Sequence, residues 1–148
     1  MKTLQELQKK IIQWAKDKDL LKLENAPKQR LKLLEEVGET AGAILKNNTD
    51  EIKDGIGDIF VVLVILSEQL NKNIIFEYED GGDVEMIDDL ISELLNTTFG
   101  DNDLEYFISY LLDICTKLNM DLTECANLAW NEIKDRKGNT IDGTFIKN

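Results

Sequence analysis

The 148-residue chain contains no histidine, one proline and two cysteines. Without histidine, a single chain cannot build a Ser-His-Asp triad, a Cys-His pair, a His-ligated zinc site or a di-iron site based on Glu-x-x-His. Any metal site must then use oxygen ligands, which favour Mg²⁺, Mn²⁺ or Ca²⁺. A general base must be a carboxylate, a lysine, a tyrosine or a metal-bound hydroxide.

The cysteines, Cys115 and Cys125, form no CxxC motif and lie in apolar periodic sequence. This predicts buried free thiols in a reducing compartment. The polar, amphipathic first ten residues do not resemble a signal peptide, and the longest apolar run, Ile59–Leu66, is too short to span a bilayer. We therefore expect a cytoplasmic protein.

Positive charge is also scarce, because 17 basic residues face 29 acidic ones, for a net charge of -12. Such a surface repels phosphate backbones and anionic lipid, so we expect neither nucleic-acid nor membrane binding. Excess acid can also serve solubility alone. The length and the 43% hydrophobic content predict one globular domain over residues 1–148.

Helical periodicity dominates the chain and predicts an all-α bundle of about five to six helices. The expected helices span residues 3–18, 27–47, 50–70, 84–98, 103–119 and 121–137. Pro27 suits a first helical turn, Thr49 or Asp50 is expected to cap the third helix, and Asp121 the last. The tail from Thr140 has β-like alternation.

Two packing expectations follow from the helices at 27–47 and 50–70. On the first, the apolar face is predicted to be buried, and Gly38 and Gly42 are expected to let a neighbouring helix approach. That face consists of Leu31, Leu34, Val37, Ala41, Ile44 and Leu45. On the second, Ile59–Leu66 is apolar all round and must be buried on every side, which suggests burial against a second subunit. Trp14 is expected in the core.

Six carboxylates gather near the turn between these two helices. Helical geometry places Glu36 and Glu39 one turn apart, with Glu35 at the edge of the same patch. Glu51, Asp54 and Asp58 form a second stripe that faces the first if the helices pack antiparallel. We expect only Lys46 and Lys53 as nearby cationic partners, so the repulsion among these carboxylates is costly unless a divalent cation is bound. An ordinary solvated helix face explains these acids equally well.

The segment Glu35-Glu36-Val37-Gly38-Glu39 resembles the EExxE motif of the MazG-like all-α NTP pyrophosphohydrolases. That family's ExxD motif follows a short distance later. Glu51-Ile52-Lys53-Asp54 matches it in letter, whereas Gly57-Asp58-Ile59 resembles the Gly-Asp and apolar run that usually carries its aspartate. Gly55 stands where the family has glutamate, so either Glu51 and Asp54 are the pair, or Asp58 is the ligand with one of them substituting.

The resemblance implies a four-helix core at about 27–70 and 103–138, a helical insertion at about 72–102, and a homodimer or homotetramer. It implies Mg²⁺-dependent hydrolysis, with Mn²⁺ possible, of a nucleoside triphosphate to the monophosphate and pyrophosphate. The implied catalytic residues are Glu35, Glu36 and Glu39, the implied metal ligands are Glu36, Glu39 and two or three of Glu51, Asp54 and Asp58, and the implied substrate-binding residues are Asn131, Lys134, Arg136 and Lys137.

Two other functions remain open on the sequence. One is a related pyrophosphohydrolase acting on phosphoribosyl-ATP, dUTP or dCTP. The other is a catalytically silent helical dimer that binds a nucleotide or a protein partner, with the acids serving only as surface. Pyrophosphate release from a panel of nucleotides distinguishes an enzyme from the silent dimer.

Overall fold

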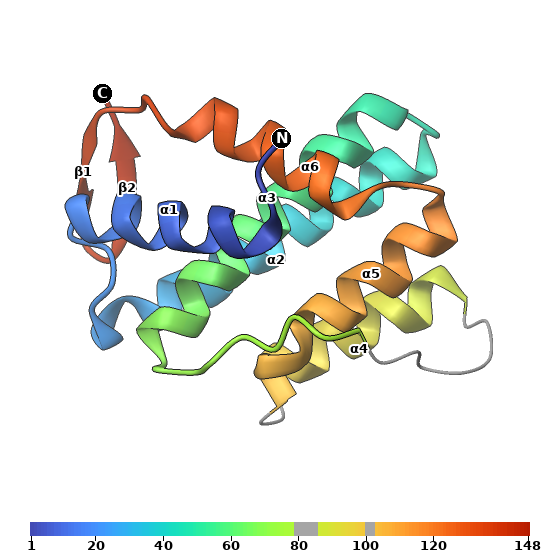
Figure 1. Ribbon diagram of the computed structural model, residues 1–148, viewed down its shortest axis with the longest axis horizontal. Coiled ribbons are helices and arrows are strands. Elements are labelled where there is room, and N and C mark those ends of the chain that lie inside the picture. Colours follow the sequence, from blue (N-terminus) through green and yellow to red (C-terminus); the bar gives the residue numbers. More distant parts are fainter. Residues whose placement is uncertain (79–85, 100–102) are drawn as a thin grey trace.

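The computed structural model describes residues 1–78, 86–99 and 103–148. These ranges contain six α-helices and one two-stranded antiparallel sheet (Figure 1), which confirms the all-α prediction. The elements are α1 (Leu4–Asp17), α2 (Ala26–Leu45), α3 (Thr49–Gln69), α4 (Ile87–Phe99), α5 (Phe107–Leu118), α6 (Leu122–Ile133), β1 (Gly138–Ile141) and β2 (Thr144–Lys147).

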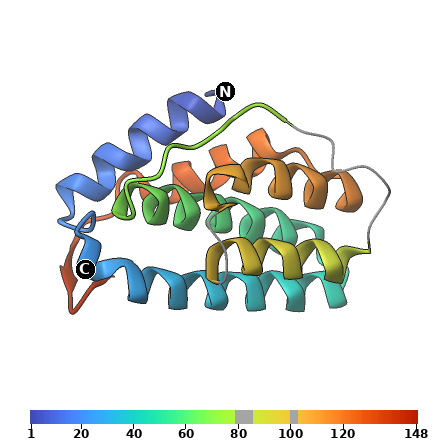
Figure 2. The same ribbon diagram turned by 90° about the horizontal axis from the view of Figure 1, so that it is seen from below.

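Helix α3 occupies the centre of the molecule. Figure 2 shows it between α1 and α2, and α6 packs along it as well. Every residue of Ile59–Leu66 is at most 7% exposed within the single chain. The expectation that this run needs a second subunit is therefore wrong, because α1, α2, α5 and α6 of the same chain already contact α3.

Two glycines of α3 allow this close packing. A Cβ atom on Gly55 would lie 2.1 Å from Thr40 Oγ1 of α2, and one on Gly57 would lie 2.2 Å from the Cys125 carbonyl oxygen of α6. Gly38 and Gly42, predicted to have this role, have no described atom within 4 Å of such a Cβ. That prediction is wrong because the two glycines of α2 face away from its neighbours.

The buried face of α2 also differs from the predicted one. Leu31, Leu34 and Leu45 are 59%, 43% and 85% exposed, whereas Gln29, Glu36 and Thr40 are buried. The polar residues are accommodated by local bonds: Gln29 Nε2 donates to the Val62 carbonyl at 3.2 Å, and Thr40 Oγ1 donates to the Glu36 carbonyl at 2.8 Å. Of the predicted face, Val37 is buried and Ala41 and Ile44 are half-buried, so apolar spacing located the buried side of this helix only in part.

Side-chain caps fix the helix ends. Thr3, Asn48 and Asp121 each accept backbone N–H groups at the start of α1, α3 and α6. Asp121 was predicted correctly, but Asn48 caps α3 in place of Thr49 or Asp50. Four helices are followed by a left-handed Asp or Asn, a conformation that these residues tolerate better than other non-glycine residues. These residues are Asp19, Asn47, Asn71 and Asn119.

The C-terminal tail forms a β-hairpin. Strands β1 and β2 pair antiparallel, with Ile141 opposite Thr144, and the intervening Asp142 and Gly143 both have positive φ. Figure 1 shows the hairpin at the end of the molecule where α1 ends. The Thr140 hydroxyl donates to the Lys18 carbonyl at 2.6 Å and holds the hairpin against α1.

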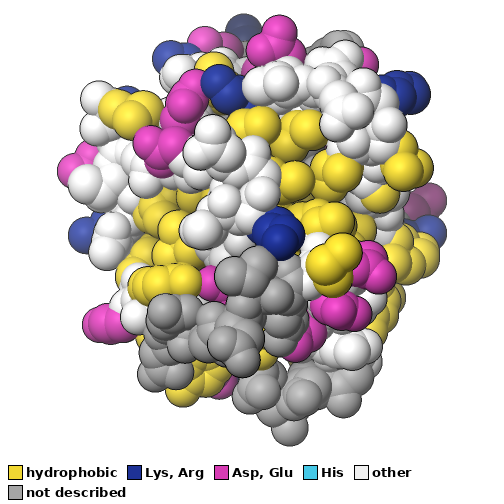
Figure 3. All heavy atoms as spheres, turned by 90° about the vertical axis from the view of Figure 1, so that its right-hand side faces the viewer, with side chains coloured by type: hydrophobic (Ala, Val, Ile, Leu, Met, Phe, Trp, Pro, Cys, Tyr) yellow, Lys and Arg dark blue, Asp and Glu magenta, His cyan; other side chains and the backbone are white. Residues whose placement is uncertain are grey.

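Helices α4 and α5 pack together beside the central bundle. Residues 79–85 and 100–102 of the predicted insertion lie outside the described ranges. The side of the molecule drawn in Figure 3 exposes hydrophobic side chains among acidic ones. Cys115 and Cys125 are buried and free, as predicted. In the described ranges, no helix combines the length and the hydropathy needed to cross a membrane.

Candidate functional site

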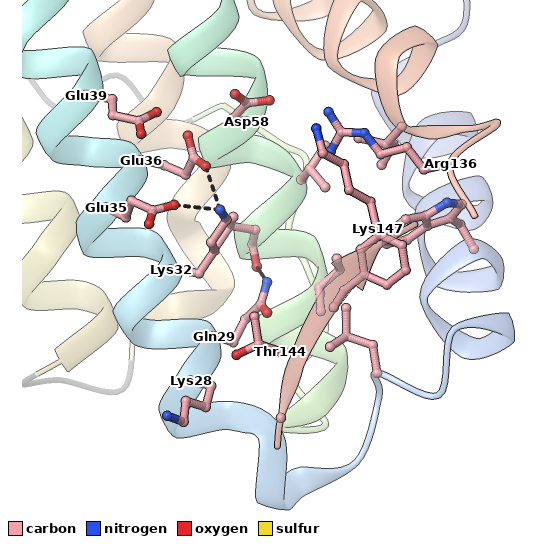
Figure 4. Close-up of a pocket in the computed structure, with 18 residues that line it drawn as sticks. Lys28, Gln29, Lys32, Glu35, Glu36, Glu39, Asp58, Arg136, Thr144 and Lys147 are labelled. Carbon is pink, nitrogen blue, oxygen red and sulfur yellow. Dashed lines mark hydrogen bonds and ion pairs between the residues drawn. The ribbon is translucent and has the colours of Figure 1, made fainter. Parts of the chain in front are cut away.

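An acidic patch lies on α2, halfway along the helix. Glu35, Glu36 and Glu39 project from it, and Glu36 is the buried member at 7% exposure. Lys32 lies one turn earlier, with its Nζ 2.6 Å from Glu35 Oε1 and 3.3 Å from Glu36 Oε1. One ammonium group is thus shared between two carboxylates, and Glu39 lies beyond it (Figure 4).

Helix α3 adds Asp58 to this patch. The contact of Gly55 with Thr40 brings α3 close to α2, and Asp58 lies one turn further along α3. In Figure 4 its carboxylate lies opposite Glu36 and Glu39. Two helices therefore supply four carboxylates to one place, because glycine at position 55 permits their close approach.

The electrostatics of the patch are unfavourable for negative charge. The pKa of Asp58 is raised to about 7, first by burial and then by the nearby carboxylates of Glu36, Glu132 and Asp54, against the lowering effect of Arg136. Burial also raises the pKa of Glu36, against the opposing effect of Lys32. Among the described residues, Glu36 Oε2 is buried without a hydrogen-bond partner. The positive charge present does not compensate these carboxylates.

The four carboxylates line a pocket of about 430 Å³. Lys28, Lys32, Arg136 and Lys147 bring positive charge to the same pocket, and in Figure 4 the cationic ends of Arg136 and Lys147 lie across from the acids. The remaining lining is largely apolar. It is formed mainly by Trp14, Leu20, Val61, Val62, Ile65, Ile133 and Phe145. The pocket thus offers a ligand acidic, basic and apolar surfaces.

The structure brings only part of the predicted site together. Of the predicted residues, the pocket is lined by Glu35, Glu36, Glu39, Asp58 and Arg136. The others lie exposed outside its lining: Glu51 and Asp54 on the first two turns of α3, Asn131 on α6, and Lys134 and Lys137 after it. Asp54 remains close enough to raise the pKa of Asp58. Of the three candidate residues for the second motif, Glu51, Asp54 and Asp58, only Asp58 therefore lines the pocket.

The carboxylate oxygens are the kind of ligand that a hard divalent cation prefers. The carboxylates are oxygen donors and partly desolvated, and Lys32 alone of the pocket cations in the described ranges forms ion pairs with them, so Mg²⁺ or Mn²⁺ would stabilise their charge. In the described part of the chain, no three acidic or cysteine side chains converge closely enough to form a complete ligand set. Mg²⁺ commonly needs only one or two carboxylates, because it keeps several waters and uses substrate phosphates as further ligands.

Several pocket residues were missed from the sequence. Lys32 had a local signal, because it stands three and four residues before Glu35 and Glu36. Lys53, which the sequence placed near the acids, instead pairs with Glu124 of α6 at 3.0 Å. The hairpin residues Phe145 and Lys147 also had a signal, since Asp142-Gly143 between alternating residues predicts a hairpin turn. Glu132, the neighbour of Asp58 on α6, had none.

Comparison with known proteins supports the resemblance. The chain is 47% identical over 77 residues to an uncharacterized 18.2 kDa protein in the rep-hol intergenic region of Haemophilus phage HP1 (strain HP1c1). The aligned part covers 52% of this chain and 47% of the phage protein, so the chain spans about half of that relative. No solved structure matches the chain.

A family model matches residues 26–86, a range that begins with α2 and contains the whole of α3. These two helices carry Glu35, Glu36, Glu39 and Asp58, the four carboxylates of the pocket. The matched family is the MazG nucleotide pyrophosphohydrolase domain, and the described helices agree with the all-α fold that the resemblance implied. Residues 26–86 of the chain are thus similar to the MazG nucleotide pyrophosphohydrolase domain.

Proposed function

We propose that the protein is a Mg²⁺-dependent nucleoside triphosphate pyrophosphohydrolase that converts a ribo- or deoxyribonucleoside triphosphate and water to the monophosphate and pyrophosphate. One observation carries the proposal: a single pocket combines four carboxylates with four cationic side chains and an apolar wall. Each surface suits one part of a nucleotide and its metal. The cations suit the phosphates, the apolar wall suits the base, and the carboxylates suit the metal ion.

The carboxylates of this chain would hold the metal. Glu36, Glu39 and Asp58 present oxygen donors from two helices, and the unpartnered Glu36 Oε2 is one acceptor left without a bond by the described residues. Mn²⁺ could replace Mg²⁺ at such a site. A bound ion would neutralise phosphate charge and activate a water for attack on phosphorus.

The other side chains of the pocket would position the substrate and move the proton. Arg136 and Lys147 lie across from the acids and would hold phosphate oxygens through charge-assisted hydrogen bonds. Glu35 is exposed and joined to the acidic patch through Lys32, so its carboxylate can accept the proton of the attacking water or serve as a further ligand. Lys134 and Lys137 would contribute only through the electrostatic field around the pocket, and Asn131, which is uncharged and exposed outside the lining, is given no role.

Asp58 is the preferred candidate for the aspartate of the second family motif. It lines the pocket, whereas Asp54 and Glu51 lie on exposed turns of α3. The glutamate that the motif would place at position 55 is excluded by Thr40, whose Oγ1 would be 2.1 Å from a Cβ there. Asp54 would therefore act on the site through its charge.

The test is pyrophosphate release from a panel of ribo- and deoxyribonucleoside triphosphates, with Mg²⁺ and with EDTA. We expect release from at least one nucleotide with Mg²⁺ and none with EDTA. Glu39→Gln should abolish release while the melting temperature stays equal or rises, because one repelling charge leaves the patch. Glu68→Gln, an exposed change elsewhere on α3, is the matched control and should behave like wild type.

Two results would contradict this function. The absence of release from every nucleotide would leave a nucleotide- or protein-binding helical protein as the better account. Strong destabilisation by Glu39→Gln with intact turnover would make Glu39 a structural residue. The same panel identifies the substrate and tests the related dUTP, dCTP and phosphoribosyl-ATP activities.

The proposal includes a cytoplasmic location, a nucleotide as the small-molecule partner, and a homodimer or homotetramer that binds neither nucleic acid nor membrane. The buried run Ile59–Leu66 no longer argues for assembly. The exposed leucines of α2, namely Leu31, Leu34 and Leu45, now support it instead.

A further inference from the structure

The C-terminal hairpin forms one wall of the pocket that contains the acidic patch, although the hairpin lies outside the segment matched by the family model. Phe145 and Lys147 both line the pocket and stand two residues apart on β2. Residues with this spacing share one face of a strand and are about 6.6 Å apart. The hairpin therefore presents an aromatic ring and a cation side by side to the same space.

Several contacts fix the hairpin against the helices. The Thr140 hydroxyl donates to the Lys18 carbonyl at 2.6 Å, directly after α1. The Asn148 N–H donates to the Lys137 carbonyl at 2.8 Å and so extends the pairing of the two strands by one residue pair. At the turn, a Cβ atom on Gly143 would lie 3.1 Å from Lys28 Cγ of α2. The hairpin is thus bonded to the end of α1 and lies close to α2 at its turn, which holds its side chains in place.

Phe145 packs against Trp14 of α1 in an edge-on pair with ring centroids 5.0 Å apart. Trp14 also lines the pocket and is only 9% exposed. Among the described residues, its indole Nε1–H is buried without an acceptor. A buried donor without a partner costs free energy, and a ligand that brings an acceptor removes this cost.

Lys147 differs from Lys32, the pocket lysine next to the acids, in its ion pairs. Lys32 is held by Glu35 and Glu36, whereas Lys147 has no carboxylate within ion-pair distance in the described part of the chain. Its ammonium group lies on the side of the pocket across from the acids (Figure 4). An anionic ligand can therefore take Lys147 without first breaking an ion pair.

We propose that the β1–β2 hairpin is a substrate-binding element of this protein. Phe145 and Trp14 form the seat for the planar base of a nucleotide, and Lys147 holds a phosphate oxygen. The spacing of Phe145 and Lys147 suits a ligand with a ring at one end and an anion at the other. This inference rests on the proposed function, because it takes the ligand to be a nucleotide.

The test is calorimetric binding of two probes with Mg²⁺ present. The first probe is an α,β-methylene nucleoside triphosphate, used in a purine and in a pyrimidine form. The second probe is tripolyphosphate, which has no ring. Phe145→Leu should weaken nucleotide binding about tenfold and leave tripolyphosphate binding unchanged, because it removes only the aromatic face. Lys147→Gln should weaken both probes about five- to tenfold. Ile146→Thr, on the exposed face of β2, should change neither.

Phe145→Tyr keeps the ring and should restore nucleotide affinity, and thermal melting of each variant monitors the fold. Equal loss of both probes in Phe145→Leu, or wild-type nucleotide binding in it, would overturn the seat for the base. Wild-type binding of both probes by Lys147→Gln would overturn the phosphate contact.

The two proposals fail differently. If no nucleotide releases pyrophosphate but the binding pattern holds, the hairpin inference stands and the hydrolase is rejected. If pyrophosphate is released and every hairpin variant binds both probes like wild type, the hydrolase stands and the hairpin inference is rejected.

Discussion

At the scale of single residues, the site is defined by Glu36 and Asp58. Both carboxyl groups are desolvated, and both have a raised pKa because burial and neighbouring acids oppose their charge. Lys32 is the one cation seen within ion-pair distance of Glu36 in the described ranges. The folded chain therefore keeps negative groups together at a cost that a divalent cation would offset.

Asp58 gives a testable dependence of stability on pH. Its pKa rises from 3.8 in the unfolded chain to about 7 in the folded one, so the folded state binds the proton more tightly. Without metal, this contribution is fully present below pH 3.8 and is lost as the pH rises through about 7. A shift of one pKa unit corresponds to about 1.4 kcal/mol of stability. Because Asp58 is partly exposed, solvent reduces this value, and we expect the free energy of unfolding to fall over this window by on the order of 3 kcal/mol.

Urea unfolding at a series of pH values in EDTA measures this slope. Asp58→Asn should flatten it and should be more stable than wild type at pH 8, where the native carboxylate is charged. A slope unchanged by the substitution would show that Asp58 is not the titrating group.

At the scale of elements, the packing of α3 depends on its glycines. Gly57→Ala should destabilise the fold by about 2–4 kcal/mol, because the new Cβ would lie 2.2 Å from the Cys125 carbonyl oxygen and 2.9 Å from Ala129 Cβ. The matched change Gly42→Ala meets open space and should stabilise α2 by about 0.5–1 kcal/mol. Chemical denaturation of both variants measures the contrast, and a Gly57→Ala protein as stable as wild type would contradict the close α3–α6 packing.

Helix positions were predictable because they depend on local pattern. Periodicity found all six helices, and the Asp121 cap was correct because a cap acts within one turn. The buried face of α2 was not predictable, because it holds Glu36 and Thr40 and leaves Leu34 exposed. The β-like alternation predicted for the tail from Thr140 is confirmed by β1 and β2, but the turn at Asp142-Gly143 was not predicted.

The candidate site was predictable where its residues share one helix. Glu35, Glu36 and Glu39 follow from helical spacing alone. The choice of Asp58 over Asp54 depends on how α3 rotates against α2, which the contact of Gly55 with Thr40 decides. Phe145 and Lys147 stand more than a hundred residues after Glu35, Glu36 and Glu39, so their presence in the pocket follows only from the tertiary structure.

At the scale of the whole molecule, assembly remains a prediction. One chain already buries Ile59–Leu66, but the exposed Leu31, Leu34 and Leu45 lie along α2 with Gly38 and Gly42. We expect sedimentation to give a mass of at least twice 16.9 kDa. Leu34→Glu should shift the protein to monomer, because a charge on this face opposes burial.

Lys10→Glu, on the exposed side of α1, is the matched control and should leave the mass unchanged. A monodisperse wild-type monomer would contradict the prediction of a homo-oligomer. A dimer that persists in Leu34→Glu would move the interface away from α2.

The central position of α3 has a further consequence for hydrogen exchange. Since α1, α2, α5 and α6 contact its buried apolar run, we expect that no local opening exposes those amides to solvent. Their exchange with deuterium therefore requires global unfolding, and the slowest amides of Ile59–Leu66 report the free energy of unfolding of the whole chain. Asp58 immediately precedes this run, so we expect a ligand that binds there and stabilises the folded chain to slow deuterium uptake along Ile59–Leu66.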